Sequence, residues 1–81
     1  MEKLTNKRLV ARLMDMSRVD RIVVNDHAVT VRIDQSRVDQ HRVTANDFMK
    51  IASEVGQEKT AVPLVKDNKG QKELWIRLER Y

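Results

Sequence analysis

The sequence of 81 residues contains no cysteine, only two glycines and one proline, and three aromatic residues. Without cysteine, the chain has no disulfide, no thiolate nucleophile and no cysteine-based zinc site, and it is compatible with a reducing compartment. Its glycines, Gly56 and Gly70, are isolated, so the glycine-rich loops that bind phosphates and dinucleotides are absent. These absences exclude several large classes of enzyme.

The residues that remain form no catalytic pattern. Ser17, Ser36 and Ser53 have no flanking glycines of the kind found at a nucleophile elbow. His27 and His41 have no further ligands at the spacing that a metal site on a helix or strand requires. We therefore expect no enzymatic activity, no cofactor and no metal.

Long apolar stretches are missing as well. The longest clearly aliphatic run is Ile22, Val23 and Val24, and the N-terminal segment has no apolar region of the signal-peptide type. We expect a cytoplasmic protein that does not associate with membranes. The length suits a single small globular domain over residues 1–81 with a thin core, so a homodimer is an alternative to a monomer.

The last third of the chain predicts a β-hairpin. An apolar run leads into the turn-forming residues 67–70, and Leu74, Ile76 and Leu78 then alternate with polar residues. Because Pro63 donates no ladder hydrogen bond, we expect the first strand of this hairpin at a sheet edge, or with the proline nitrogen facing outward.

A helix and a second hairpin are expected at the start of the chain. Apolar spacing predicts the helix from about Asn6 to Met16, with Thr5 as its N-cap. The hairpin is expected from Val19 to Asp34, with Arg32 exposed on its second strand. The residues of that strand that we expect to be buried are Val29, Val31 and Ile33.

The middle of the chain predicts a loop followed by a second helix. The segment from Gln35 to Val43 is polar and has no convincing period, so we expect a loop there. The second helix is expected from about Ala45 to Val55, with Thr44 as its cap residue and Gly56 just past its end.

The predicted element order is α-β-β-α-β-β. This order fits a two-layer α+β domain, in which one four-stranded antiparallel sheet carries both helices on its apolar face. The order is similar to that of glucose-type phosphotransferase B domains and LAGLIDADG homing endonucleases. However, the chain has neither the phosphoacceptor cysteine of the former nor the acidic helix motif of the latter. It also resembles, in architecture only, the adaptor domains that dock on Clp-type unfoldases.

The outer face of the last strand predicts a binding surface. Its alternation places Trp75, Arg77 and Tyr81 together, and Trp, Tyr and Arg are enriched at interface hot spots. The alternative is a structural Trp75, packed under a loop or against the chain end. We expect a small protein-binding regulator, an inhibitor or adaptor of a larger protein complex, of the type that phages and other mobile elements encode. The predicted partner-binding residues are Trp75, Arg77, Tyr81 and Arg32.

The charge of the chain supports a second hypothesis. Sixteen Lys and Arg residues against twelve Asp and Glu residues give a net charge of +4, which favours anionic partners in general. A basic nucleic-acid-binding protein is therefore the alternative, although stacking aromatics are few and a helix-turn-helix pair is missing. Its predicted contact residues are Lys7, Arg8, Arg12, Arg18, Arg37 and Arg42.

Overall fold

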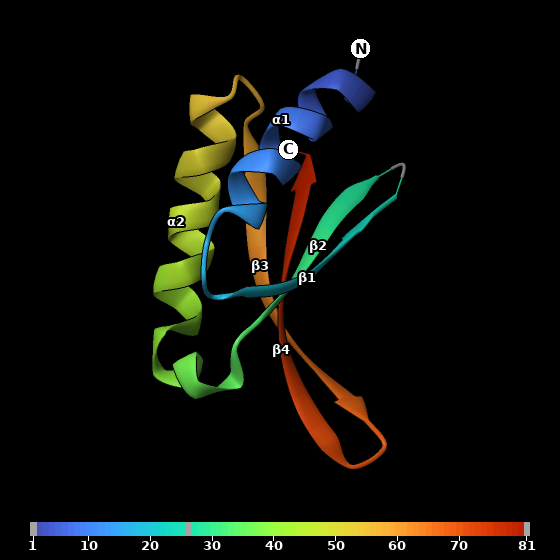
Figure 1. The fold of residues 1–81 in the computed structure, drawn as a ribbon, viewed down its shortest axis with the longest axis vertical. Helices are drawn as coiled ribbons and strands as arrows, with labels where there is room; N and C mark the ends of the chain where they lie inside the picture. Colours follow the sequence, from blue (N-terminus) through green and yellow to red (C-terminus); the bar gives the residue numbers. More distant parts are fainter. Residues whose placement is uncertain (1, 26, 81) are drawn as a thin grey trace.

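The computed structural model describes residues 2–25 and 27–80 of the chain, without the side chains of residues 2–6 and 37. Within these ranges, two α-helices, one 3-10 helix and four strands follow one another (Figure 1). Their order is α1 (Glu2–Met14), β1 (Val19–Val24), β2 (Ala28–Ile33), η1 (Gln35–Gln40), α2 (His41–Glu54), β3 (Lys59–Asn68) and β4 (Gln71–Arg80).

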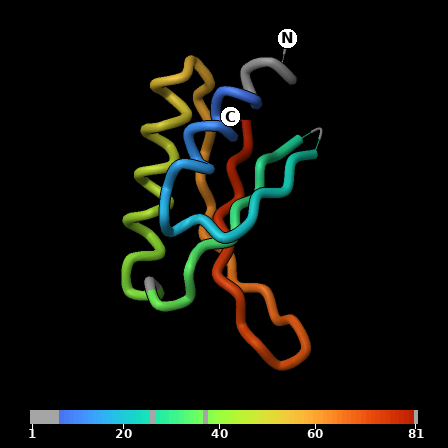
Figure 2. Tube along the Cα trace, viewed as in Figure 1, coloured from blue at the N-terminus to red at the C-terminus, as the bar shows by residue number. Residues whose placement is uncertain are grey.

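The four strands form one antiparallel sheet in the order β1-β2-β4-β3. Both helices lie on the same face of this sheet, α2 alongside β3 and α1 nearer β1 (Figure 1, Figure 2). The other face carries no helix from the described part of the chain. The predicted two-layer α+β architecture is confirmed.

The apolar face of the sheet is built mainly by the two central strands. β2 and β4 pair along their length, so their inward side chains form matched rows. The buried pairs are Val29 with Leu78, Val31 with Ile76, and Ile33 with Leu74. All six residues are buried as the alternation predicts.

The helices close the core from the other side. Leu9 and Leu13 of α1 and Phe48 and Ala52 of α2 are fully buried and pack against the strand residues. Their spacing of four residues places each pair on one side of its helix. The apolar sides of both helices therefore face the sheet.

β3 is an edge strand, as its proline predicts. The β3–β4 turn consists of Lys69 and Gly70, which have φ angles of 54° and 83°, the signature of a type I′ turn. In such a hairpin the flanking pair, Asn68 and Gln71, is hydrogen-bonded, and bonded and non-bonded pairs then alternate. Pro63 falls at a non-bonded position, so its nitrogen faces outward and no ladder bond is lost.

The first helix differs from its prediction at both ends. It begins at Glu2, so Thr5 lies inside the helix and is not its N-cap. Glu, Lys and Leu have high helix propensity, so the residues before Thr5 extend the helix although no apolar period marks them. The helix ends at Met14 because the chain then turns, and the N–H of Met16 donates to the carbonyl oxygen of Leu13 at 3.1 Å.

The prediction of a loop from Gln35 to Val43 is wrong. The segment forms η1 and then the first turn of α2, which begins at His41. Asp34 stabilises the start of η1, because its Oδ1 accepts a hydrogen bond from the N–H of Ser36 at 2.9 Å.

Contacts with β4 hold this segment in place. The side-chain Nε2 of Gln35 donates to the carbonyl oxygen of Lys72. The Nε2 of His41 lies 2.8 Å from the carbonyl oxygen of Trp75. Both contacts join residues far apart in the sequence, which is why no local pattern reveals them.

The second helix is confirmed at its C-terminal end only. Thr44 is not a cap but a fully buried residue inside α2, and its hydroxyl oxygen accepts a hydrogen bond from Nη1 of Arg18 at 3.3 Å. At the other end Gly56 has a φ of 81°. Its N–H donates to the carbonyl oxygen of Ser53, and the next N–H donates to that of Ala52, as in a Schellman motif.

We predict that Phe48→Ala lowers the free energy of unfolding by about 3–5 kcal/mol, because it leaves a cavity between α2 and the sheet. Urea unfolding followed by circular dichroism measures the change. The matched control is Met14→Ala, since Met14 is exposed at the end of α1 and its replacement should cost less than about 0.5 kcal/mol. Equal losses in the two variants would contradict the assigned core.

Candidate protein-binding surface

The sheet face opposite the helices is the candidate site, and we call it the open face. Cross-strand register arranges its side chains in rows across the four strands. One row contains Val23, Thr30, Arg77 and Val62, and the next contains Arg21, Arg32, Trp75 and Leu64. The fold thus brings together three of the predicted partner-binding residues, and the fourth, Tyr81, lies outside the described residues.

Trp75 lies on the open face, as the alternation predicts, but its ring is covered. The residue is only 7% exposed. The Nζ of Lys66 lies over the ring, 4.3 Å from its centroid, where a cation is attracted to the aromatic face. The indole Nε1 donates to Oε1 of Glu73 at 3.2 Å. Trp75 therefore forms the floor of the open face, and its neighbours form the accessible surface.

Arg32 is half-buried, whereas the sequence predicts an exposed side chain. It lies opposite Trp75 in the register of β2 and β4. Its Nη1 is 3.2 Å from Oε2 of Glu73. The carboxylate of Glu73 thus joins the indole of Trp75 to the guanidinium of Arg32.

Arg77 is the predicted residue that reaches the surface. Its side chain is 49% exposed, and its Nε lies 2.6 Å from Oε1 of Glu79. Two exposed valines, Val23 and Val62, lie on the same row. We call Val23, Thr30, Arg77 and Val62 the Arg77 row, which presents one cation between apolar side chains.

The residues that cover Trp75 are not among the predicted partner-binding residues. Lys66 and Glu73 lie opposite each other on the hairpin, and Leu64 lies opposite Trp75. A two-residue turn at Lys69 and Gly70 fixes this register, and side chains on diagonal positions of one face reach each other. The position of the turn in the sequence could therefore have predicted that Lys66 and Glu73 lie near Trp75.

The surroundings of Glu73 shift its pKa downward from the ordinary value of 4.5. The first cause is the hydrogen bond from Trp75, and hydrogen bonds from Asn68 and Arg32 and the charge of Arg32 act in the same direction. Desolvation opposes them. Because the folded-state pKa is lowered, ionised Glu73 stabilises the fold above the unfolded-state pKa, and this stabilisation is lost as the pH falls through the folded-state pKa.

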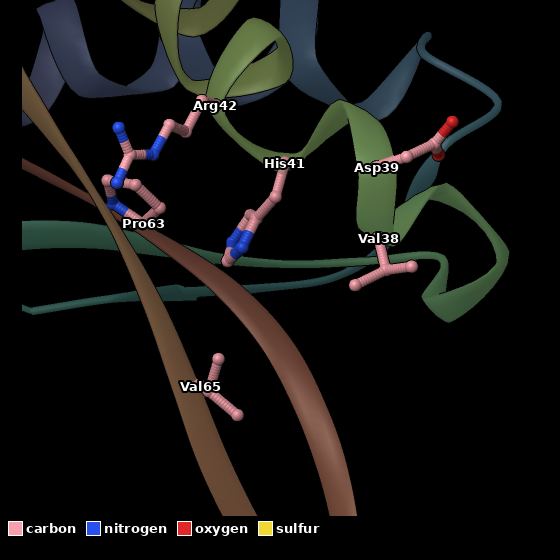
Figure 3. Close-up of a pocket in the computed structure, with 6 residues that line it drawn as sticks. All are labelled: Val38, Asp39, His41, Arg42, Pro63 and Val65. Carbon is pink, nitrogen blue, oxygen red and sulfur yellow. The ribbon is translucent and has the colours of Figure 1, made fainter.

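A hollow of ≈ 450 Å³ lies on the helix side of the molecule, between η1, the start of α2 and β3 (Figure 3). The ring of His41 is engaged by the carbonyl oxygen of Trp75, and Asp39 points away from it (Figure 3). The described lining thus holds no carboxylate placed to exchange a proton with this histidine. The lining residues are Val38, Asp39, His41, Arg42, Pro63 and Val65.

Two cations of the nucleic-acid hypothesis are engaged by carboxylates of α2. The Nη2 of Arg12 lies 2.7 Å from Oε2 of Glu54. The Nη1 of Arg18 lies 3.3 Å from Oδ2 of Asp47 and is half-buried. A phosphate would have to compete with these carboxylates.

The other cations of that hypothesis lie at two places, and Arg8 is one helical turn from Arg12. Lys7 and Arg8 are exposed on α1. Arg42 lies at the start of α2, roughly 18 Å along the helix from Glu54. The side chain of Arg37 lies outside the described residues. The described cations of that hypothesis are thus divided between α1, the segment after it and the start of α2, and two of them are already paired.

No family model, no curated protein and no solved structure matches this chain. Among residues 2–25 and 27–80, no three His, Cys, Asp or Glu side chains are grouped so as to hold a metal ion. No helix of these ranges is long and apolar enough to cross a bilayer. Function is therefore inferred from the open face alone.

We predict that Glu73→Gln lowers the free energy of unfolding near neutral pH, because the amide keeps an acceptor for Trp75 but loses the attraction to Arg32. The difference from the wild type should shrink as the pH falls below 4.5 through the folded-state pKa of Glu73. Urea unfolding over a series of pH values measures it.

The matched control is Glu58→Gln, because Glu58 is exposed and forms no ion pair with a described residue. This variant should have the same free energy of unfolding as the wild type near neutral pH. A deficit of Glu73→Gln that stays constant into the acid range would rule out the assigned ion pair.

Proposed function

We propose that this protein is a small non-enzymatic regulator, an inhibitor or adaptor, that binds a larger protein or protein complex in the cytoplasm. The observation that supports this proposal is the Arg77 row, a half-exposed arginine between exposed valines on the sheet face that carries no described helix. Apolar and arginine side chains combined on a flat surface are typical of protein interfaces.

The geometry of Arg77 suits a carboxylate on the partner. A guanidinium binds a carboxylate through two parallel N–H groups, and its flat faces stack on apolar groups. Glu79 engages Nε of Arg77, which orients the side chain and leaves the terminal nitrogens without an acceptor among the described residues. We infer that the partner presents an acidic residue flanked by apolar side chains, which would contact Val23 and Val62.

Trp75 and Arg32 lie in the row next to the Arg77 row. The cation over the ring and the ion pair with Glu73 hold both side chains in fixed positions beside the Arg77 row. Because Trp75 is buried, its replacement by alanine would cost about 3–5 kcal/mol of stability and would obscure any effect on binding. Arg77 is therefore the residue on which binding is tested.

We predict that the tagged protein captures one protein stoichiometrically from a bacterial lysate, with or without nuclease treatment. Arg77→Glu should reduce this capture about tenfold or more, because it places a carboxylate against the acidic residue of the partner. Quantitative mass spectrometry of the captured proteins measures the change. Circular dichroism of Arg77→Glu should show a melting temperature lowered by only a few degrees, since the side chain and its ion pair with Glu79 are half-exposed.

The matched control is Arg8→Glu, which makes the same charge reversal on α1, in the residue set of the nucleic-acid hypothesis. Capture should be unaffected by this change. A captured set that disappears on nuclease treatment, or that is lost with Arg8→Glu and kept with Arg77→Glu, would establish the nucleic-acid alternative instead.

A further inference from the structure

The two edges of the sheet offer different backbone groups to another strand. β3 is blunted, because Pro63 has no N–H and its nitrogen lies on the outer side of the strand. β1 contains no proline, and no described strand lies beyond it in the sheet. An edge with free N–H and carbonyl groups is a template for pairing with another chain. β1 is therefore the edge at which the sheet can grow.

The hydrogen-bond pattern identifies the free groups of β1. The N–H of Asn25 donates to the carbonyl oxygen of Ala28 at 3.0 Å, so Asn25 and Ala28 form a hydrogen-bonded pair at the end of the ladder between β1 and β2. Bonded and non-bonded pairs alternate from there. Val23 thus directs its backbone groups toward β2, whereas Ile22 and Val24 direct theirs outward.

The side chains at this edge are apolar and exposed. Val23 on the open face is 41% exposed, and Val24 on the helix face is 50% exposed. The charged residues of the strand, Asp20 and Arg21, lie toward its other end, where the register with β2 is irregular. The edge thus combines free backbone groups with uncovered β-branched side chains.

We propose that β1 pairs with β1 of a second copy of this chain, antiparallel, about a twofold axis at Val23. Val23 then lies opposite Val23 of the second copy, in a non-bonded pair, because its backbone groups face β2. Val24 lies opposite Ile22 of the second copy, in a hydrogen-bonded pair, because both direct their backbone groups outward. Arg21 lies opposite Asn25 of the second copy, so this cation meets a neutral side chain.

The sequence of β1 favours this register over one with the axis at Ile22. An axis at Ile22 would place Val23 opposite Arg21 and Val24 opposite Asp20, so each exposed valine would meet a charged side chain. With the axis at Val23, the valines meet apolar side chains on both faces of the sheet. The strand is thus complementary to itself, which identifies a second copy as the occupant of the edge.

The dimer is closed and independent of the regulator proposal. A symmetric pair uses the same patch on both chains, so pairing stops at two. The two sheets join into one continuous sheet, with both copies of the Arg77 row on the same face. Val23 stays on the open face in the dimer, because Val23 of the second copy lies beside it in the same sheet. Binding to a partner through Arg77 is possible for the monomer as well as the dimer.

The absence of cysteine from the natural sequence allows a direct test. In Val23→Cys, the two thiols would face each other across a non-bonded pair, where Cα atoms are about 4.5 Å apart and within the range of a disulfide. Under mild oxidation this variant should form a covalent dimer at least about tenfold faster than Val38→Cys. Val38 is the matched control, because it is 64% exposed on η1, away from the edge.

The second readout is the association constant of the chain without an introduced cysteine, measured by analytical ultracentrifugation. The wild type should associate in a concentration-dependent way. Val23→Lys, which sets two cations opposite each other at the axis, should lower the association constant about tenfold or more with an unchanged circular dichroism spectrum. The proposal is overturned if Val23→Cys cross-links no faster than Val38→Cys, or if Val23→Lys associates as strongly as the wild type.

Discussion

Three residues of β4, Leu74, Ile76 and Leu78, are buried between the sheet and the helices. Because side chains alternate along a strand, their burial directs the residues between them to the opposite face. Each of the three buried side chains contributes roughly 1.5–3 kcal/mol when removed from water. A slip of one residue in the register would move all three to the opposite face, so the register is strongly specified. Trp75 and Arg77 consequently lie on the open face, and the sheet has one side packed by the helices and one side without a described helix.

The covered Trp75 links these two sides. Its carbonyl oxygen is contacted by His41 at the start of α2, while its ring is held by Lys66 and Glu73 on the open face. The same residue therefore anchors a helix on one side of the sheet and forms the floor of the candidate surface on the other. A surface with a rigid floor loses little conformational entropy on binding, which favours affinity for a partner.

Sequence reasoning succeeded where a local rule decides the structure. Pro63 marked the edge strand and Gly56 marked the end of α2, because each has a backbone property that few positions accept. It failed for residues 35–43, which are ordered by contacts with β4 that are distant in the sequence. It placed Trp75 on the correct face but not under Lys66, since the covering depends on the register of the hairpin.

Native-state hydrogen exchange of the β4 amides tests most directly whether this strand holds the fold together. The amides of residues 74–78 lie between β2 and β3, so we predict that they exchange only through global unfolding. Their free energy of opening should then equal the free energy of unfolding measured with urea. Exchange of the Ile76 amide through a lower-energy local opening, while amides of α2 stay protected, would contradict the central role of β4.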